Sequence, residues 1–275
     1  MKKTLNCCGR ILDLSTPVIM GIVNVTPDSF YDGGKIKDEK LLLTLVDRML
    51  NDGASIIDVG GQSTRPRAQK IEAEEEWNRI HSTLTIINTN YPKAIISVDT
   101  FYSEVARKAI DAGASIINDI SAGGFDERIY SVAAEAGAPY VAMHMQGEPA
   151  TMQENPFYSD VLKEVLQFFV ERIEKIRNAG VNDIIIDPGF GFGKTVEHNF
   201  ILLNNLEALG IFGYPILAGL SRKSIITKAL NVKSQDALNG TTALNTIALM
   251  NGASIIRVHD VKEAIEVVKL LGQLK

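Results

Sequence analysis

Gly53-Ala-Ser-Ile-Ile57 occurs again as Gly113-Ala-Ser-Ile-Ile117 and as Gly252-Ala-Ser-Ile-Ile256. Each copy follows a helical pattern, and its glycine suits the left-handed conformation that often closes a helix. The isoleucines suit a strand with both faces buried in a parallel sheet. The residue after each copy is polar, namely Asp58, Asn118 and Arg257. Looser copies occur at 136–144 and 179–187. This repeated unit predicts a (β/α)8 TIM barrel, an α/β fold with functional groups at the C-terminal ends of its strands.

The repeat extends to a full set of strands. They are expected at 18–24, 55–59, 95–99, 115–120, 139–144, 184–187, 215–219 and 254–258, with amphipathic helices between them. A (β/α)8 barrel usually has about 250 residues, and no low-complexity linker interrupts the chain. We therefore expect a single domain over residues 1–275. Residues 4–12 predict a short β-hairpin around Gly9 that plugs the N-terminal end of the barrel.

Composition narrows the classes of partner. The net charge of −5 argues against a nucleic acid or a membrane surface, so an anionic ligand must be held by a few local cations. The adjacent Cys7 and Cys8 suit neither a disulfide framework nor a zinc site, and reduced thiols predict a cytoplasmic protein. No apolar run approaches the ~18 residues of a membrane helix, and none follows Met1 as a signal peptide requires.

Polar side chains stand at the strand ends. They are Asn24, Asp58, Asp99, Asn118, His144, Asp187, Arg257 and His259. A barrel interior is normally filled by Val, Ile and Leu, and carboxylates are seldom buried without a ligand or partner. Asp99, Asn118 and Asp187 are therefore candidate ligand contacts. Asp58 and His144 can equally be polar groups that the rim itself satisfies. Long connections at 26–38, 60–73 and 146–158 are typical of lids or binding loops.

The segment Asp187 to Thr195, DPGFGFGKT, resembles two phosphate-binding motifs without matching either. A P-loop requires glycine at the position of Pro188, and the dinucleotide fingerprint requires a wider final glycine spacing. We interpret the segment as a flexible turn that places Asp187 in the cavity and presents Phe192.

An anion site is expected after the last two strands, where barrels usually bind phosphate. Gly219 to Ser224 offers small residues and helix N-terminal amides, and Lys223 adds charge. Arg257 and His259 are two residues apart on a strand, so both cations face the same way. A structural ion pair with Glu263 is the alternative role for Arg257.

Two other enzyme classes fit poorly. A zinc hydrolase needs clustered histidines, but those at 81, 144, 198 and 259 share no metal spacing. A Schiff-base aldolase needs a lysine within a strand, whereas Lys223 lies beyond one. The sequence also offers no nucleophile–base pair.

Taken together, these motifs resemble those of the dihydropteroate synthase family over nearly the whole chain. The stretches are Met20 to Phe30 (MGIVNVTPDSF), Gly60 to Pro66 (GGQSTRP), Ser97 to Thr100 (SVDT), Asn118 to Ser121 (NDIS), Met143 to Gly147 (MHMQG), Asp187 to Thr195, Ser221 to Ser224 (SRKS) and Arg257 to Asp260 (RVHD). One departure is Arg67, where many members carry glycine.

The resemblance implies that 6-hydroxymethyl-7,8-dihydropterin pyrophosphate and 4-aminobenzoate are joined to 7,8-dihydropteroate, with release of pyrophosphate, on the route to folate. It assigns the pterin to Asp99, Asn118, Met143, Asp187 and Lys223. It assigns pyrophosphate to Asn24, Arg257 and His259, with Mg²⁺ at Asn24, and 4-aminobenzoate to Thr64, Arg65, Pro66, Phe192 and Ser224. Phe30 belongs to a loop that covers the site.

Two alternatives share the pterin-binding barrel. A methyltetrahydrofolate-dependent corrinoid methyltransferase has no reason to carry Ser63 to Pro66 or the Arg257/His259 pair, because it releases no pyrophosphate. A non-catalytic pterin-binding protein needs only the deep pocket, so Asn24, Arg65 and Arg257 count against it. The resemblance also implies a homodimer.

Overall fold

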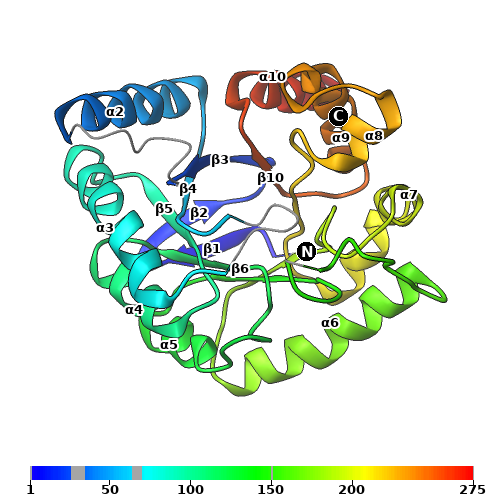
Figure 1. Cartoon of the computed structure of the whole chain (residues 1–275), viewed down its shortest axis with the longest axis horizontal. Helices are drawn as coiled ribbons and strands as arrows, with labels where there is room; N and C mark the ends of the chain where they lie inside the picture. The colour runs from blue at the N-terminus through cyan, green and yellow to red at the C-terminus, as the bar shows by residue number, and fades with distance from the viewer. Residues whose placement is uncertain (1, 26–34, 64–69, 150, 275) are drawn as a thin grey trace.

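In the computed structural model, eight parallel strands form a barrel with helices around its outside (Figure 1). The structure describes residues 2–25, 35–63, 70–149 and 151–274, with the backbone alone for 35–38. The strands are β3 (Val18–Asn24), β4 (Ile56–Gly60), β5 (Ile95–Asp99), β6 (Ile116–Asp119), β7 (Tyr140–Met143), β8 (Ile184–Asp187), β9 (Leu217–Ala218) and β10 (Ile255–Val258). They pair in the order β8-β7-β6-β5-β4-β3-β10-β9, and a bridge from Ile186 to Ile216 closes the ring. The predicted fold and all eight strands are confirmed.

Helices follow the strands and cover the outer surface of the barrel. They are α2 (Lys35–Asp52), α3 (Ala73–Asn90), α4 (Ser103–Asp111), α5 (Ile129–Ala136), α6 (Val161–Asn178), α7 (Val196–Asn204), α8 (Ser224–Leu230), α9 (Leu238–Met250) and α10 (Val261–Leu271), with short 3-10 helices η1 (Leu206–Phe212), η2 (Ser234–Asp236) and η3 (Gly272–Leu274). No helix in the described part of the chain is long and apolar enough to span a membrane.

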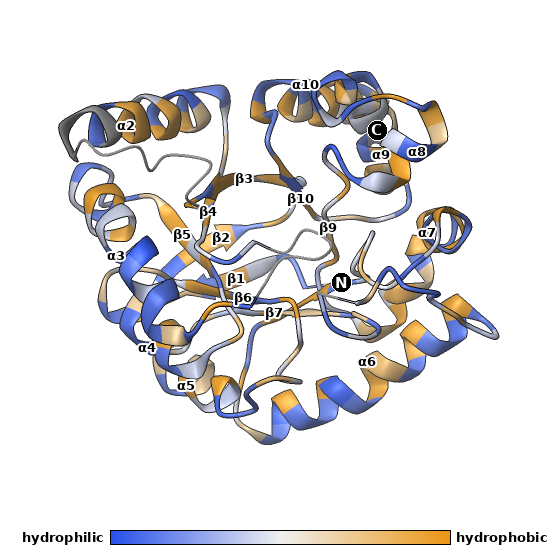
Figure 2. Ribbon diagram, viewed as in Figure 1, coloured by the Kyte–Doolittle hydropathy of each residue, from blue (hydrophilic) through white to orange (hydrophobic). Residues whose placement is uncertain are grey.

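Helix α6 shows why these segments are helical and how they dock. Its buried residues are Val161, Val165, Phe169, Ile173 and Ile176, which recur every three or four positions. Asp160 caps the first turn by accepting a hydrogen bond from the backbone N–H of Lys163 at 3.0 Å. The apolar stripe therefore faces the barrel while polar residues face solvent (Figure 2).

The glycine of the repeated pentapeptide ends the preceding helix as predicted. Gly113 has a φ of 106°, and Gly53 and Gly252 have φ values of 107° and 94°. A Cβ atom at Gly113 would also collide with the side chain of Asn88. The backbone conformation therefore favours glycine at the turn from α4 into β6, and a larger residue would also displace the Asn88 side chain.

Side chains two apart on a strand face the same way, so the barrel interior is layered. The lower layer is fully buried and apolar, and it comprises Met20, Ile56, Ile116, Val141, Ile185, Leu217 and Ile255. Against it pack Leu5, Cys7 and Leu12 of the antiparallel hairpin β1 (Thr4–Cys7) and β2 (Arg10–Asp13). Each such side chain contributes about 1.5–3 kcal/mol when fully buried. The predicted plug at the N-terminal end is therefore present.

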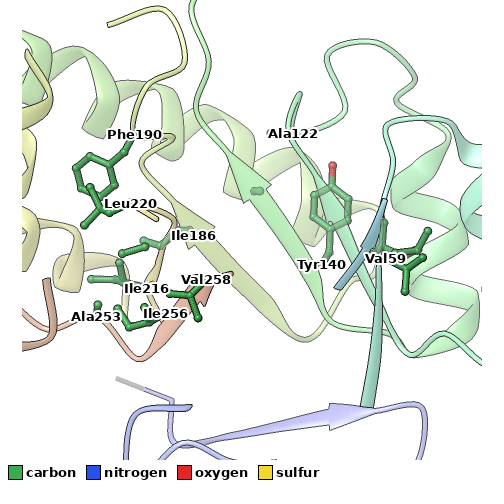
Figure 3. Packing of buried hydrophobic residues seen from close by; sticks show 14 of the residues in the cluster. Val59, Ala122, Tyr140, Ile186, Phe190, Ile216, Leu220, Ala253, Ile256 and Val258 are labelled. Atoms are coloured by element: carbon green, nitrogen blue, oxygen red, sulfur yellow. The ribbon is translucent and has the colours of Figure 1, made fainter. Parts of the chain in front are cut away.

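The outward-facing side chains of the strands form the second part of the core, under the helices. Figure 3 shows Ile186, Ile216 and Ile256 grouped where β8, β9 and β10 meet, with Phe190 and Leu220 above them. This packing fixes the exits of β8 and β9, from which the site residues project.

Candidate functional site

Two residues beyond the apolar layer, the interior of the barrel becomes polar. Asp58 follows Ile56, Asn118 follows Ile116, Asp187 follows Ile185 and Arg257 follows Ile255, each on the same face of its strand. A cavity of about 620 Å³ opens at this end of the barrel. Arg257 lines this cavity, and the other three side chains lie at the strand ends beside it.

Arg257 is held by two carboxylates at the floor of the site. Its Nε donates to Asp58 Oδ2 at 2.6 Å, and its Nη2 donates to Asp99 Oδ2 at 2.7 Å. Asp58 is fully buried and also accepts from Asn118 Nδ2 at 3.3 Å. The two carboxylates explain the orientation of Arg257, so the alternative ion pair with Glu263 is wrong. Asp58 is thus satisfied internally, the simpler of the two roles considered for it.

Burial controls the ionisation of this cluster. It raises the pKa of Asp99 to about 7, although the adjacent positive charge of Arg257 acts in the opposite direction. Despite its burial, Arg257 keeps its charge, because Asp58 and Asp99 raise its pKa. Asp187 is also buried, and burial raises its pKa while the positive charge of Lys223 opposes that shift.

The glycine-rich turn after β8 is held in place by Lys194. This buried ammonium group donates to the carbonyl oxygens of Gly189 at 2.9 Å and Phe192 at 3.0 Å, and contacts His144 Nδ1 at 2.9 Å. A Cβ on Gly189 would collide with the carbonyl oxygen of His144. The prediction of a flexible turn is therefore wrong, because these glycines allow close packing. His144 is a rim group satisfied by its neighbours.

Lys223 links the exits of β8 and β9. Its Nζ donates to the carbonyl oxygen of Phe190 at 2.8 Å and lies 4.7 Å from the centre of the Phe192 ring. Desolvation lowers the pKa of Lys223 to about 8, and the negative charge of Asp187 opposes this shift. Ser224 follows directly and starts helix α8. Phe192, Lys223 and Ser224 therefore share one wall of the cavity.

His259 differs from its predicted role as a cation. Desolvation in the cavity and the positive charge of Arg257 lower the pKa of His259 to about 4, so the imidazole is neutral at pH 7. Its Nδ1 lies 3.0 Å from Ser221 Oγ. The structure therefore contains a serine–histidine pair that sequence reasoning did not expect, because the two residues are 38 positions apart.

The structure brings most of the predicted site residues together. The cavity is lined by Asn24, Phe192, Lys223, Ser224, Arg257 and His259. Asp99, Asn118, Met143 and Asp187 lie at the strand ends beside it. The predicted residues Phe30, Thr64, Arg65 and Pro66, and the unusual Arg67, lie outside the described residues.

Three contributors were missed by reasoning from sequence. Lys194 lies within the segment Asp187 to Thr195. A lysine at such a position is typical of phosphate-binding loops, so the sequence does not indicate that Lys194 is buried. Arg222, which lines the cavity, and Asp260 form an ion pair at 2.7 Å. Their place in the motifs at 221–224 and 257–260 was the one signal available.

A polar cavity at the C-terminal ends of the strands defines this barrel as a ligand-binding enzyme of the (β/α)8 type. Residues 20–259 match the family of pterin-binding enzymes, and the chain belongs to that family. It is 46% identical to the dihydropteroate synthase of Escherichia coli (strain K12) over 265 residues, which cover 96% of this chain and 93% of that protein. Within the pterin-binding enzymes, the chain is a member of the dihydropteroate synthase family.

Solved structures agree with this placement. The Yersinia pestis dihydropteroate synthase, in complex with a sulfonamide drug, has a TM-score of 0.92 and 42% identity, and the match covers 98% of each chain. The Xanthomonas albilineans dihydropteroate synthase with 4-aminobenzoic acid has a TM-score of 0.91 and 39% identity, and the match covers 100% of this chain and 98% of that one.

Proposed function

We propose that this chain condenses 6-hydroxymethyl-7,8-dihydropterin pyrophosphate with 4-aminobenzoate, forming 7,8-dihydropteroate and pyrophosphate. The observation that carries the proposal is a cavity lined by Arg257 and His259 with buried polar groups next to it. Asp187 and Asn118 lie at the strand ends beside this cavity and are buried. Membership of the dihydropteroate synthase family supports the same reaction.

The buried carboxylate of Asp187 suits a pterin. The Asp187 carboxylate can accept paired N–H bonds from the 2-amino-4-oxo edge of the ring, and such charge-assisted bonds are strong where water is excluded. Only one Asp187 oxygen, Oδ1, is used within the described residues, by the backbone N–H of Gly189 at 2.7 Å. Asn118, Met143, Asp99 and Lys223 complete this proposed pocket.

The cavity wall at Arg257 and His259 suits pyrophosphate. Arg257 supplies a permanent positive charge, and His259 supplies a neutral hydrogen-bond donor. Asn24 lines the same cavity, and its side chain makes no hydrogen bond to the described residues. A single amide oxygen fits Mg²⁺, which usually keeps waters and binds through phosphates. No cluster of three acidic, His or Cys ligands occurs among the described residues.

The proposed reaction needs no protein nucleophile. The bond between the methylene carbon and the bridging oxygen breaks, and pyrophosphate leaves with the electron pair. The electron-rich pterin delocalises the positive charge left on the methylene carbon. The amine nitrogen of 4-aminobenzoate then forms the new C–N bond and loses a proton. Mg²⁺ bound to the leaving group would neutralise the charge that develops there.

The 4-aminobenzoate pocket is proposed at the wall formed by Phe192 and Ser224, with Thr64, Arg65 and Pro66 from the loop after β4. Phe192 offers a ring face for the aminobenzoate ring, and the Lys223 ammonium group lies above it. The start of helix α8 at Ser224 offers backbone N–H groups to the carboxylate.

Pyrophosphate release with both substrates and Mg²⁺ tests the reaction. We expect release to require the pterin pyrophosphate and 4-aminobenzoate together, with 7,8-dihydropteroate as product. Methyl transfer to a corrinoid would favour the methyltransferase alternative. Pterin binding without turnover would favour a non-catalytic binding protein.

A pair of variants tests these two sets of contacts. Asp187→Asn removes a charged acceptor worth about 1.5–3 kcal/mol, so bare pterin should bind about 10- to 150-fold more weakly. His259→Ala should spare bare pterin and weaken the pyrophosphorylated form. Arg257 is the poorer choice because it also holds Asp99. An equal loss of affinity for bare pterin in Asp187→Asn and His259→Ala, measured by titration calorimetry, would contradict this assignment of pterin and pyrophosphate contacts.

We also propose a homodimer and a cytoplasmic location. Large apolar side chains are exposed on two helices that pack together, Phe200 and Ile201 on α7 with Ile247 and Met250 on α9. A second copy would cover them, and light scattering of Met250→Glu against the parent chain tests this.

The proposed cytoplasmic location rests on the free thiols of Cys7 and Cys8.

A further inference from the structure

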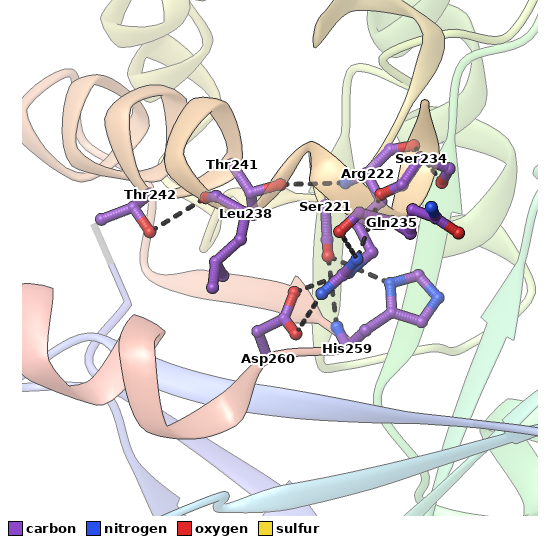
Figure 4. A network of polar contacts seen from close by, with 9 residues as sticks. All are labelled: Ser221, Arg222, Ser234, Gln235, Leu238, Thr241, Thr242, His259 and Asp260. Atoms are coloured by element: carbon purple, nitrogen blue, oxygen red, sulfur yellow. Dashed lines mark hydrogen bonds and ion pairs between the residues drawn. The ribbon is translucent and has the colours of Figure 1, made fainter. Parts of the chain in front are cut away.

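Ser221 and His259 make two hydrogen bonds to each other where β9 and β10 end (Figure 4). The backbone N–H of His259 donates to Ser221 Oγ at 3.3 Å. The same oxygen lies 3.0 Å from Nδ1 of the His259 ring. Both residues line the cavity, so the second ring nitrogen, Nε2, is the one left for a ligand.

The donor and acceptor inventory favours one direction for the side-chain bond. A serine hydroxyl has one hydrogen to donate and two lone pairs, and the His259 amide uses one lone pair. Within the described residues, Nδ1 is the one acceptor in contact with the Ser221 hydroxyl hydrogen. The reverse arrangement would leave that hydrogen without an acceptor among the described residues. The hydrogen bonds therefore favour an unprotonated Nδ1, with the hydrogen on Nε2.

The residues that follow this pair hold its backbone in place. Arg222 follows Ser221, and Asp260 follows His259. Arg222 Nε and Nη2 donate to the two Asp260 oxygens at 2.9 and 2.7 Å, a bidentate pair (Figure 4). Arg222 has a φ of 58°, and its backbone N–H donates to Thr241 Oγ1 at 3.0 Å. The exits of β9 and β10 are thus joined on both sides of the serine–histidine contact.

We propose that Ser221 is a positioning residue, which holds His259 as the Nε2–H tautomer so that Nε2 donates a hydrogen bond to the leaving pyrophosphate. The proposal rests on the proposed function, which places pyrophosphate at Arg257 and His259. A neutral, oriented donor stabilises the developing charge without placing a second cation beside Arg257. A lowered pKa of His259 supports the neutral form.

A serine–histidine contact can also indicate a nucleophile and its base. Here, however, the Ser221 hydroxyl oxygen accepts a hydrogen bond from the backbone N–H of His259. The same hydroxyl contacts Nδ1 of the His259 ring, which leaves Nε2 for a ligand. A covalent role predicts that Ser221→Thr loses activity as fully as Ser221→Ala, with a modified serine during turnover.

Nitrogen NMR of the histidine side chains tests the tautomer directly. The substrate-free protein is labelled with ¹⁵N, and the His259 signals are assigned by their loss in His259→Gln. In the parent chain and in Ser221→Thr we expect hydrogen on Nε2, and in Ser221→Ala a mixture of tautomers. A protonated Nδ1 in the parent chain overturns the proposal, whether or not any variant folds.

Kinetics and binding test the consequence. We expect Ser221→Ala to lower kcat and pyrophosphate affinity by about 10- to 100-fold. This magnitude is taken from metal sites, where removing the hydrogen-bond partner of a ligating histidine has such an effect. KM for 4-aminobenzoate and the affinity for bare pterin should not change, and Ser221→Thr should restore kcat. Thr242→Ala is the control, because its hydroxyl bonds to the Leu238 carbonyl within α9 at 3.1 Å.

These outcomes separate the two proposals. An unchanged kcat in Ser221→Ala, or a covalently modified Ser221, overturns the positioning role. A parent chain that releases no pyrophosphate contradicts the proposed function, whereas the NMR result still decides the tautomer.

Discussion

Glu76 is a buried acid, and its titration should limit stability at high pH. It lies in the first turn of α3 and is fully buried. Burial raises the pKa of Glu76 from 4.5 to about 8, although a hydrogen bond with the Thr100 side chain acts in the opposite direction. The group is therefore neutral in the folded protein at pH 7 and charged in the unfolded chain.

The sign and size of the effect follow from proton linkage. Between pH 4.5 and 8 the folded state binds more protons at Glu76 than the unfolded state, so stability falls as pH rises. With 1.36 kcal/mol per pKa unit, the loss at this one site is about 1 kcal/mol at pH 5, about 3 kcal/mol at pH 7 and about 5 kcal/mol at pH 9. Glu76→Gln removes the titration and keeps the shape of the side chain.

Urea unfolding of both proteins from pH 5 to pH 9, followed by the single tryptophan Trp77 and by circular dichroism, provides the measurement. Titrations of groups that do not interact with Glu76 cancel in the difference between the variant and the parent. The free energy of unfolding of Glu76→Gln should rise relative to the parent by about 4 kcal/mol over this range. Parallel pH profiles would refute the reasoning, because they would mean that Glu76 titrates alike in both states. Glu74→Gln, at an exposed site in the same turn, is the matched control.

Two further predictions concern the binding loops and the turn after β8. 4-Aminobenzoate should bind the free protein weakly and bind much better with Mg²⁺-pyrophosphate present. The reason is that the anion held by Arg257 and His259 would attract Arg65 and favour the closed pocket. Equal affinities in paired calorimetric titrations would mean that the pocket is already formed. Gly189→Ala should destabilise the protein by at least about 1–3 kcal/mol, because Gly189 has a φ of 68° and a Cβ there meets the His144 carbonyl. Gly210→Ala, where a Cβ meets nothing within 4 Å, should change the urea midpoint little, and equal effects would rule out the steric explanation.

The strands and their exits could be predicted because they depend on local patterns. The Gly-Ala-Ser-Ile-Ile repeat carries the helix end and the buried strand in five residues, and the two-residue period fixes which side chains enter the barrel. The sequence pattern alone therefore predicts that Asp187 and Arg257 enter the barrel interior at the C-terminal ends of their strands. The hairpin plug was predictable for the same reason, since Leu5 and Leu12 lie on either side of Gly9 with short strand patterns around them.

Ionisation and hydrogen-bond partners could not be predicted because they depend on contacts far apart in sequence. The neutral state of His259 results from desolvation beside Arg257, and its bond to Ser221 exists because β9 and β10 are neighbours. Glu76 is the last of three consecutive acidic residues, a pattern typical of a solvated helix start, yet the fold buries it. Lys194 has no predicted role in the sequence, yet it donates to the carbonyl oxygens of His144, Gly189 and Phe192.

The depth of the cavity is itself a consequence of small residues at two inward-facing positions. Gly60 lies two residues beyond Asp58 on β4 and pairs in register with Asp99 on β5, where a Cβ would lie 3.2 Å from the Asp99 Cβ. Gly219 lies two residues beyond Leu217, and a Cβ there would lie 3.5 Å from Lys223 Nζ. At either position a larger side chain would occupy the space through which Asp99 and Lys223 reach the centre of the barrel. Inward- and outward-facing residues alternate along each strand, and this alternation places the apolar layer at the N-terminal end of the barrel. On β4 and after β9 the same inward-facing row ends in Gly60 and Gly219, and Gly219 lines the cavity.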